Sequence, residues 1–309
     1  MSGSGAGSTT RAGERDGDHR GAVVVGVPLE GRGEAAVRWA AAEARDRGWP
    51  LRLVLALAVP RGSYPGRGIV GADPGTALRT MARRELADMH RVAEEIAPGL
   101  PVSEDVIESG AVAVLRAQAH TASLVVIGND GLGHLADLVF SGVARGLAGH
   151  IDVPLVVVPQ ACDPEVRGRA DGRAPVVVGD DGSSGARAAL AFAAERAAER
   201  DAALVVVRAG PDARLLSEDA PAIGADRPPA VRVVIAEERA DRVLADQARD
   251  AQLVVLGVGE HGWLRHRHHV RTGVVLHATC PVVVVPPGAT SAATPADGAG
   301  VTVAPPPSG

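Results

Sequence analysis

Short apolar runs alternate with longer, alanine-rich segments along most of the chain. Apolar runs of this length are typical of strands, and runs without polar alternation are typical of strands buried on both faces of a parallel sheet. In the first half the pattern predicts, in order, a strand at 22–27, a helix at 33–47, a strand at 51–58, a helix at 75–97, a strand at 102–107, a helix at 111–121, a strand at 124–127, a helix at 141–149 and a strand at 154–158. Because alternating strands and helices form βαβ units, we expect an α/β fold with a small, doubly wound parallel sheet.

The chain contains an internal repeat. Three apolar motifs occur twice, at residues 23–26 and 176–179, at 124–128 and 253–257, and at 154–159 and 281–286. The offset between the copies falls from 153 to 129 and then to 127, so the second copy lacks 24 residues in its middle and 2 more in a later loop. Its segment 211–230 is rich in Pro and Asp and also contains Gly224. This composition indicates that the long second helix of the first copy is missing or vestigial in the second.

The repeat predicts two domains, at 21–160 and 174–287, of which the second is shortened, with a polar linker at 161–173. Residues 1–20 and 288–309 have little apolar content and no periodicity. Because such segments cannot offset the entropy of ordering, we expect both to be disordered tails.

Composition narrows the classes of function. All 32 basic residues are Arg, and a chain without lysine cannot carry a P-loop lysine, a Schiff-base lysine or a lysine general base. The net charge of -5, with acids and Arg interspersed, argues against nucleic-acid binding. Cys162 and Cys280 stand far apart in unlike contexts, so neither a disulfide framework nor a CxxC site is indicated. The polar N-terminus and the absence of a long apolar run predict a cytoplasmic protein with no membrane partner.

The second copy carries acidic residues where a ligand site is expected. In an open α/β sheet, ligands bind beyond the carboxyl ends of the strands. The first strand of the second copy is followed there by residues 180–184 (DDGSS), and a carboxylate at this position can hold a ribose or a metal-bridged phosphate. Helix capping explains Ser183 or Ser184 equally well, but it does not explain Asp181. The corresponding residue of the first copy is Pro28, which has no carboxylate.

The first copy instead has glycines after its fourth strand. Gly128 and Gly131 follow that strand, and Ser141 and Gly142 open the next predicted helix. Glycines let a backbone approach a phosphate, and a helix N-terminus offers free N–H groups to it. Spacing alone favours an ordinary glycine-rich turn. The second copy has Gly257 in the same place.

A basic stretch at 261–271 follows Gly257 and includes His266, His268 and His269. No Cys or carboxylate stands at zinc-ligand spacing near these histidines, so we favour an anion-attracting rim over a metal site. The charge of such a rim grows as the pH falls through about 6.5. No Ser–His–Asp arrangement or G-x-S-x-G motif is evident, so we expect no catalytic residue and no metal.

Both copies resemble domains of the universal stress protein family. Residues 176–183 (VVVGDDGS), followed by an Ala-rich helix, resemble the opening strand and turn of that family, V-V-V-G-x-D-G-S. Residues 128–142 match the length of its nucleotide loop, G-x-x-G-x9-G-[ST], and residues 279–284 (TCPVVV) resemble its closing strand. The resemblance covers nearly all of both predicted domains.

The resemblance implies a Rossmann-like, adenine-nucleotide α-hydrolase-like sheet of five parallel strands in each copy. It further implies a role in stress survival, and ATP binding in some members. Asp181 would be the strand-end acid, and Gly128 and Gly131 would line the phosphates. The candidate nucleotide-site residues are Gly128, Gly131, Ser141, Gly142, Asp181, Gly182 and Gly257.

Each copy departs from the family pattern. In the first copy Pro28 replaces the acid, and residues 141–142 (SG) invert the G-[ST] pair. In the second copy residues 268–269 (HH) replace that pair, and Glu260 stands where the second glycine belongs. A side chain at such a position blocks close backbone approach. We therefore expect a non-catalytic stress-response regulatory or interaction protein with degenerate, weak or absent ATP binding; the alternative is a functional ATP-binding stress sensor.

The resemblance also implies self-pairing through the last strand of each copy, at 155–158 and 282–285. Each would be an exposed apolar edge in an isolated domain, and such edges promote aggregation. We expect the two to pair within one chain as a pseudo-twofold dimer, with the identity of further protein partners left open.

Overall fold

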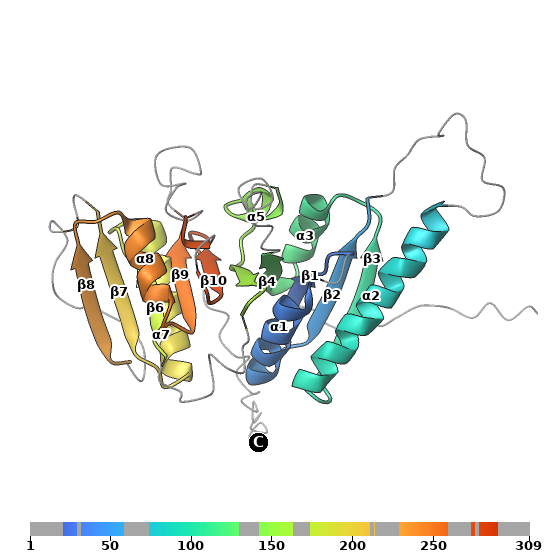
Figure 1. Ribbon diagram of the computed structural model, residues 1–309, viewed down its shortest axis with the longest axis horizontal. Coiled ribbons are helices and arrows are strands. Elements are labelled where there is room, and N and C mark those ends of the chain that lie inside the picture. The colour runs from blue at the N-terminus through green and yellow to red at the C-terminus, as the bar shows by residue number, and fades with distance from the viewer. Residues whose placement is uncertain are drawn as a thin grey trace, which may run out of the picture.

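One ten-stranded sheet runs through both copies of the repeat (Figure 1). The computed structural model describes residues 21–29, 32–58, 74–129, 142–162, 174–210, 213, 229–258, 273–275 and 278–289. The strands are β1 (Ala22–Gly26), β2 (Leu51–Ala56), β3 (Val102–Ile107), β4 (Ala122–Asn129), β5 (Leu155–Pro159), β6 (Val176–Gly179), β7 (Leu204–Ala209), β8 (Val231–Ala236), β9 (Leu253–Gly257) and β10 (Val282–Val285). The helices within the described residues are α1 (Glu34–Arg47), α2 (Pro74–Ile96), α3 (Ala111–Ala119), α5 (Val143–Leu147), α7 (Ser184–Glu199) and α8 (Ala240–Ala248).

The strand order is β3-β2-β1-β4-β5-β10-β9-β6-β7-β8, so the two halves repeat one order in opposite directions. Neighbouring strands are parallel everywhere except between β5 and β10, which are antiparallel. The predicted α/β fold, with a parallel five-stranded unit in each copy, is confirmed.

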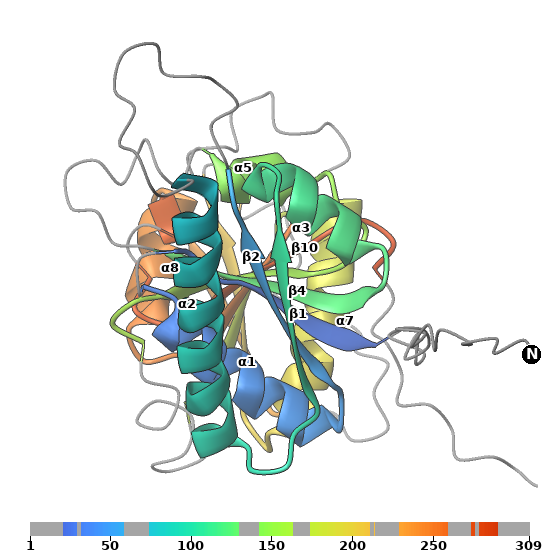
Figure 2. The same ribbon diagram turned by 90° about the vertical axis from the view of Figure 1, so that its right-hand side faces the viewer.

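Helices cover both sides of the twisted sheet (Figure 2). Successive strand residues point to opposite faces. In β1, Val23 and Val25 enter the core formed with α1, α2 and α7, whereas Val24 enters the core formed with α3, α5 and α8. Full burial of a Val or Leu side chain contributes about 1.5–3 kcal/mol, so a chain that is 2% aromatic can still build two cores from aliphatic side chains.

β4 is longer than the sequence pattern predicts. Gly128 and Asn129 were expected in a loop, but they pair with Val158 and Pro159 of β5 as the last residues of the strand. Apolar pattern alone misses them because neither side chain is apolar, while their backbone groups complete the ladder.

The shortening of the second copy falls between β7 and β8. The connection from β2 to β3 spans residues 57–101, whereas the one from β7 to β8 spans residues 210–230, which accounts for the 24-residue difference. Most of the shorter connection lies outside the described residues, and so does the predicted loss of its helix.

The predicted tails and linker also lie outside the described residues, except at their edges. Cys162 is buried, and its backbone N–H donates to the Pro159 carbonyl at 2.9 Å. Ala289 is half-buried against the core, and its N–H donates to Pro286 at 3.3 Å. The turns that follow β5 and β10 therefore pack against the sheet units for two residues beyond the predicted ends at 160 and 287. None of the helices in the described part of the chain combines the length and apolar character needed to cross a bilayer.

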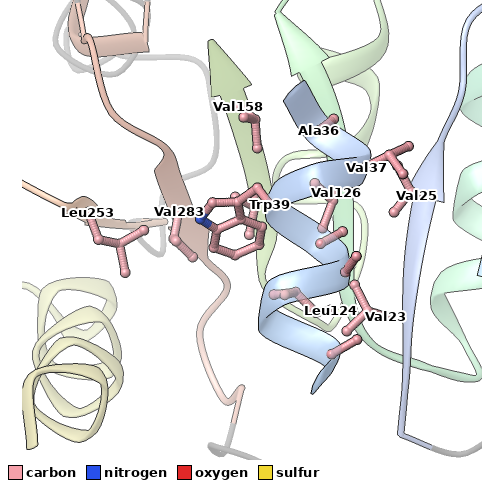
Figure 3. Close-up of a cluster of buried hydrophobic side chains, with 14 of the residues drawn as sticks. Val23, Val25, Ala36, Val37, Trp39, Leu124, Val126, Val158, Leu253 and Val283 are labelled. Atoms are coloured by element: carbon pink, nitrogen blue, oxygen red, sulfur yellow. The ribbon is translucent and has the colours of Figure 1, made fainter. Parts of the chain in front are cut away.

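The two halves join through β5 and β10. Val156 lies opposite Val283, flanked by the pairs Leu155–Val284 and Val157–Val282. Positions 156 and 283 are equivalent in the repeat, so an approximate twofold axis passes between them. The predicted pairing of the two last strands within one chain is present. Trp39 reaches from α1 across this junction to Val283 (Figure 3).

Candidate functional site

A cavity lies at the carboxyl ends of β1 and β4, where the strand order of the first half reverses. This switch point is where open α/β sheets bind ligands. The starts of α3 and α5 border this half-open cavity above the strand ends. Its lining residues are Gly26, Val27, Pro28, Val54, Ala56, Ala111, Leu115, Ile127, Gly128, Asn129, Val143, Ala144 and Val157.

The cavity is small, with a volume of about 170 Å³. An apolar cavity of about 150 Å³ admits benzene, whereas pockets for drug-sized ligands measure about 300–1,000 Å³. The described part of the site therefore has room for one ring system and not for an entire nucleoside triphosphate.

The described lining of the cavity contains no charged side chain, and only Asn129 has a polar one. The Nδ2 of Asn129 donates to the Val275 carbonyl in the second half at 3.4 Å. This amide is thus turned toward the other copy. Val27 and Pro28 line the cavity at the positions equivalent to Asp180 and Asp181, so no carboxylate is available there to bind a ribose or a metal ion.

Two predicted glycines border this cavity. Gly128 lines it at the end of β4, and Gly142 is the N-cap of α5, next to the lining residue Val143. The Gly142 carbonyl accepts the N–H of Gly146 at 3.1 Å, which closes the first turn of α5.

In the second half, the acid that follows β6 is bound to an arginine. Arg208 Nε donates to Asp180 Oδ2 at 2.9 Å, and the two side chains are only 6% and 12% exposed. Asp180 Oδ1 also accepts the N–H of Gly182 at 3.0 Å. A carboxylate held this way is neutralised by the protein itself.

The next residues form the turn into α7. Asp181 is exposed, and its Oδ1 accepts the N–H of Ser183 at 3.0 Å. Gly182 has φ +74°, a conformation that glycine adopts without strain. Ser183 is the N-cap of α7, and its Oγ accepts the N–H of Ala186 at 3.1 Å. Helix capping, one of the two interpretations offered by the sequence, therefore explains Ser183.

Gly257, the equivalent of Gly128, is covered by α7. A Cβ on Gly257 would lie 2.0 Å from the Gly185 carbonyl oxygen and 2.7 Å from the Ala186 nitrogen. Only a glycine lets the start of the helix pack this closely against the end of β9. Close packing of the helix start against the strand end explains why glycine is needed here, and no ligand has to be invoked.

The structure thus brings Gly128 and Gly142 to one cavity in the first half, and it places Asp181, Gly182 and Gly257 around the start of α7 in the second. Gly131 and Ser141 lie outside the described residues. So do the histidine-rich stretch 261–271 and Glu260. Within the described residues no cluster of His, Cys, Asp or Glu could hold a metal ion.

Sequence reasoning missed Asn129 and the Asp180–Arg208 pair. A signal for the pair was present, because Arg208 interrupts an otherwise apolar strand (LVVVRA). A buried guanidinium needs a nearby carboxylate, and Asp180 directly follows the adjacent strand, β6. No sequence signal connects Asn129 with Val275, because their contact depends on how the two halves meet.

Comparison with known proteins relates both halves of the chain to one protein family. The sequence model described as "Universal stress protein family" matches residues 20–159 and 173–286. A universal stress protein of Mycolicibacterium smegmatis is 29% identical over 292 residues, which cover 86% of this chain and 97% of that protein. One from Mycobacterium tuberculosis is 29% identical over 260 residues, or 76% and 85% of the two chains.

Among solved structures, a universal stress protein from Archaeoglobus fulgidus matches with a TM-score of 0.64 at 16% sequence identity. The match covers 86% of this chain and 96% of that one. At this identity the likeness concerns the fold, and it extends across both halves.

Proposed function

Because this chain belongs to the universal stress protein family, we propose that it acts in the stress response as a non-catalytic, cytoplasmic regulatory or interaction protein with weak or absent affinity for ATP. The observation that carries this proposal is the uncharged lining of the cavity in the first half. A triphosphate and its Mg²⁺ need donors, cations or carboxylates, and the described lining offers only backbone groups and the amide of Asn129.

The second half supports the same proposal for a different reason. Asp180, which follows β6, is already paired with Arg208, and the glycine at the end of β9 is covered by α7. The predicted acid, Asp181, is exposed and accepts the N–H of Ser183 in the turn into α7. A nucleotide that used Asp180 or approached the backbone of Gly257 would have to displace a nearly buried ion pair or the start of α7. Both displacements cost free energy that binding would have to supply.

A second candidate function, that of an ATP-binding stress sensor, is favoured by one observation. The cavity of the first half lies at the switch point of the sheet, borders Gly128 and has room for a ring the size of a base. In this alternative the adenine ring occupies the cavity and the phosphates extend past α5.

Calorimetric titration of the full chain with ATP and Mg²⁺ separates the two candidates. We expect no saturable binding at ATP concentrations below about 1 mM, which corresponds to a binding free energy weaker than about -4 kcal/mol. Sub-millimolar binding would contradict the proposal and support the sensor. A parallel assay for released phosphate tests the non-catalytic part, and we expect no ATP turnover above that of a buffer blank.

Two alanines of α3 give a matched pair of variants for this titration. Ala111 lines the cavity, so Ala111→Leu narrows it from the rim. Ala113 is exposed on the same helix and lines no part of it, so Ala113→Leu is the control. If ATP binds in the cavity, the first variant weakens binding and the second leaves it unchanged.

A further inference from the structure

The two halves are related by an approximate twofold axis. Their backbones follow this symmetry, but the charged side chains at the axis do not. Helices α1 and α7 lie on the same face of the sheet, because both pack into the core that contains Val156 and Val283. They therefore flank the pseudo-twofold axis above the β5–β10 junction.

Glu43 of α1 and Arg196 of α7 occupy equivalent positions, 153 residues apart, which is the offset of this part of the repeat. Arg196 Nη1 lies 3.4 Å from Glu43 Oε1, and the residues are only 1% and 5% exposed. Two equivalent residues of a twofold interface contact each other only at the axis. The axis thus passes through a buried pair of opposite charges.

Further charges surround this pair. Glu43 also accepts hydrogen bonds from Arg47 Nε and Arg200 Nη2, each at 2.6 Å. Glu199 Oε2 lies 3.0 Å from Arg196 Nη1 and 3.4 Å from Arg47 Nη2. Arg47 and Arg200 are themselves equivalent positions with the same charge. Within the cluster formed by these residues, Glu43 and Arg196 are the equivalent positions that carry opposite charges.

Stability alone does not account for this pair. Arg196 Nε is buried without a hydrogen-bond partner among the residues that the structure describes, and Nη2 lies 3.0 Å from Glu195 Oε1 without hydrogen-bond geometry. A buried ion pair with unsatisfied donors is often no more stable than an apolar pair of the same size. The best-attested role of such buried polar pairs is to specify which surfaces associate.

The strands at the junction do not determine which two copies pair. Residues 155–157 are Leu-Val-Val and residues 282–284 are Val-Val-Val, so either strand could pair with a copy of itself. Pairing of two first copies would bring two Glu43 carboxylates together at the buried axis. Pairing of two second copies would bring two Arg196 guanidiniums together there. Like charges opposed in a dry interface are a known means of rejecting a partner.

We propose that Glu43 and Arg196 make this interface selective, so that the first copy accepts a partner with a cation at the axis and the second copy accepts one with an anion there. The linker favours pairing within a chain by raising the effective concentration of the two halves. During synthesis, however, a finished first copy exists before its second copy. The charge of Glu43 rejects another first copy at that stage.

The charge on Glu43 is secure at neutral pH. Burial raises the pKa of this carboxyl, but the guanidiniums of Arg200 and Arg47 outweigh burial and hold the pKa below its ordinary value. In the closed chain Glu43 is therefore ionised at neutral pH and pairs with Arg196 as an anion.

Re-association of the two halves after cleavage tests the proposal. A protease site placed within residues 163–173 of the full chain is cut, the halves are separated in denaturant and refolded together, and native mass spectrometry counts the pairs. We expect unlike pairs to outnumber like pairs by roughly ten-fold or more in the wild type. In Glu43→Gln/Arg196→Gln, which removes both charges, we expect a nearly random distribution of pairs.

The matched control removes an exposed ion pair of α8, Asp246 and Arg249, and Asp246→Asn/Arg249→Gln should keep the wild-type selectivity. A random distribution in the wild type, or full selectivity in the uncharged variant, would overturn the proposal.

If the separated halves do not refold, variants of the uncut chain test the proposal instead. Glu43→Arg and Arg196→Glu each place like charges at the axis, so light scattering should show loss of the closed monomer. In an equimolar mixture Glu43 of one variant can pair with Arg196 of the other, and the two substituted positions form a second pair with the charges reversed. A two-chain species should therefore form. Either variant remaining a monomer with the wild-type melting temperature would contradict the proposal.

Discussion

Arg208 Nε donates a hydrogen bond to Asp180 Oδ2 at 2.9 Å, and neither side chain is more than 12% exposed. The equivalent residues of the first half are Leu55 and Val27, both buried. The same place in the repeated fold therefore holds an ion pair in one copy and an apolar pair in the other. The carboxylate of Asp180 in the second copy therefore stabilises the fold.

Removing the arginine should destabilise the second half. Arg208→Leu deprives a nearly buried carboxylate of its guanidinium, and we expect the free energy of unfolding to fall by about 3 kcal/mol. Asp180→Val/Arg208→Leu reproduces the first copy, and it should recover most of the loss because apolar pairs often replace buried ion pairs without cost. Urea unfolding measures both variants. A double variant as unstable as the single one would contradict this explanation.

Gly257 should tolerate no side chain. Gly257→Ser places a Cβ within 2.0 Å of the Gly185 carbonyl oxygen, so α7 must shift, and we expect a loss of about 2–3 kcal/mol. Gly110 is the control, because its Cβ position is open and it is the N-cap of α3, where serine is favoured. Gly110→Ser should be neutral or slightly stabilising. Equal melting temperatures for the two variants would show that the close packing at Gly257 is not required.

Two adjacent serines should respond differently to alanine. Ser183 caps α7, so Ser183→Ala should cost about 1 kcal/mol. Ser184 Oγ is buried with no hydrogen-bond partner among the described residues, so Ser184→Ala should leave stability unchanged or raise it. Thermal unfolding of the two variants side by side provides the comparison. A larger loss for Ser184→Ala would mean that its hydroxyl has a role the structure does not show.

Most of the fold could be predicted from the sequence. Runs such as 23–26 and 176–179 are apolar on both faces, and only a buried parallel sheet accommodates them. The repeat then predicted the second half from the first, and the family resemblance, together with the apolar edges at 155–158 and 282–285, predicted the junction. Chain pattern is informative here because burial of whole strands dominates the energetics.

The polar details were harder to predict. Gly128 and Gly257 look alike in sequence, yet one borders a cavity and the other is covered by a helix start. Glu43 and Arg196 look like ordinary charges on Ala-rich helices, and their pairing follows only from the position of the axis. Such contacts depend on distances of a few ångströms between segments remote in sequence, which periodicity does not encode.

The buried cluster at the axis should give stability a pH dependence of predictable sign. Burial opposes ionisation of Glu43, but Arg200 and Arg47 outweigh it, so its pKa is below the ordinary 4.5 in the folded chain. A lowered folded pKa contributes stability that is present above the unfolded pKa and is lost as the pH falls through the folded pKa. Glu43→Gln should therefore lose less stability than the wild type as the pH falls below about 4.5.

Glu199 provides the control with the opposite sign. Burial raises its pKa in spite of the nearby Arg47, so the folded chain binds a proton more readily there than the unfolded chain does. Its contribution favours folding at low pH and diminishes as the pH rises above 4.5 through the raised folded pKa. Glu199→Gln should accordingly lose less stability than the wild type over that rise. Urea unfolding at a series of pH values, plotted as differences from the wild type, should give slopes of opposite sign.

The mass of the purified full chain under native conditions tests the central claim most directly. A functional nucleotide site would add the mass of a bound adenine nucleotide to the chain, whereas an uncharged cavity of about 170 Å³ should not retain one. We expect native mass spectrometry to give the mass of the polypeptide alone, before and after incubation with ATP and Mg²⁺. A stoichiometric adduct with the mass of an adenine nucleotide, lost in Ala111→Leu and kept in Ala113→Leu, would contradict the account.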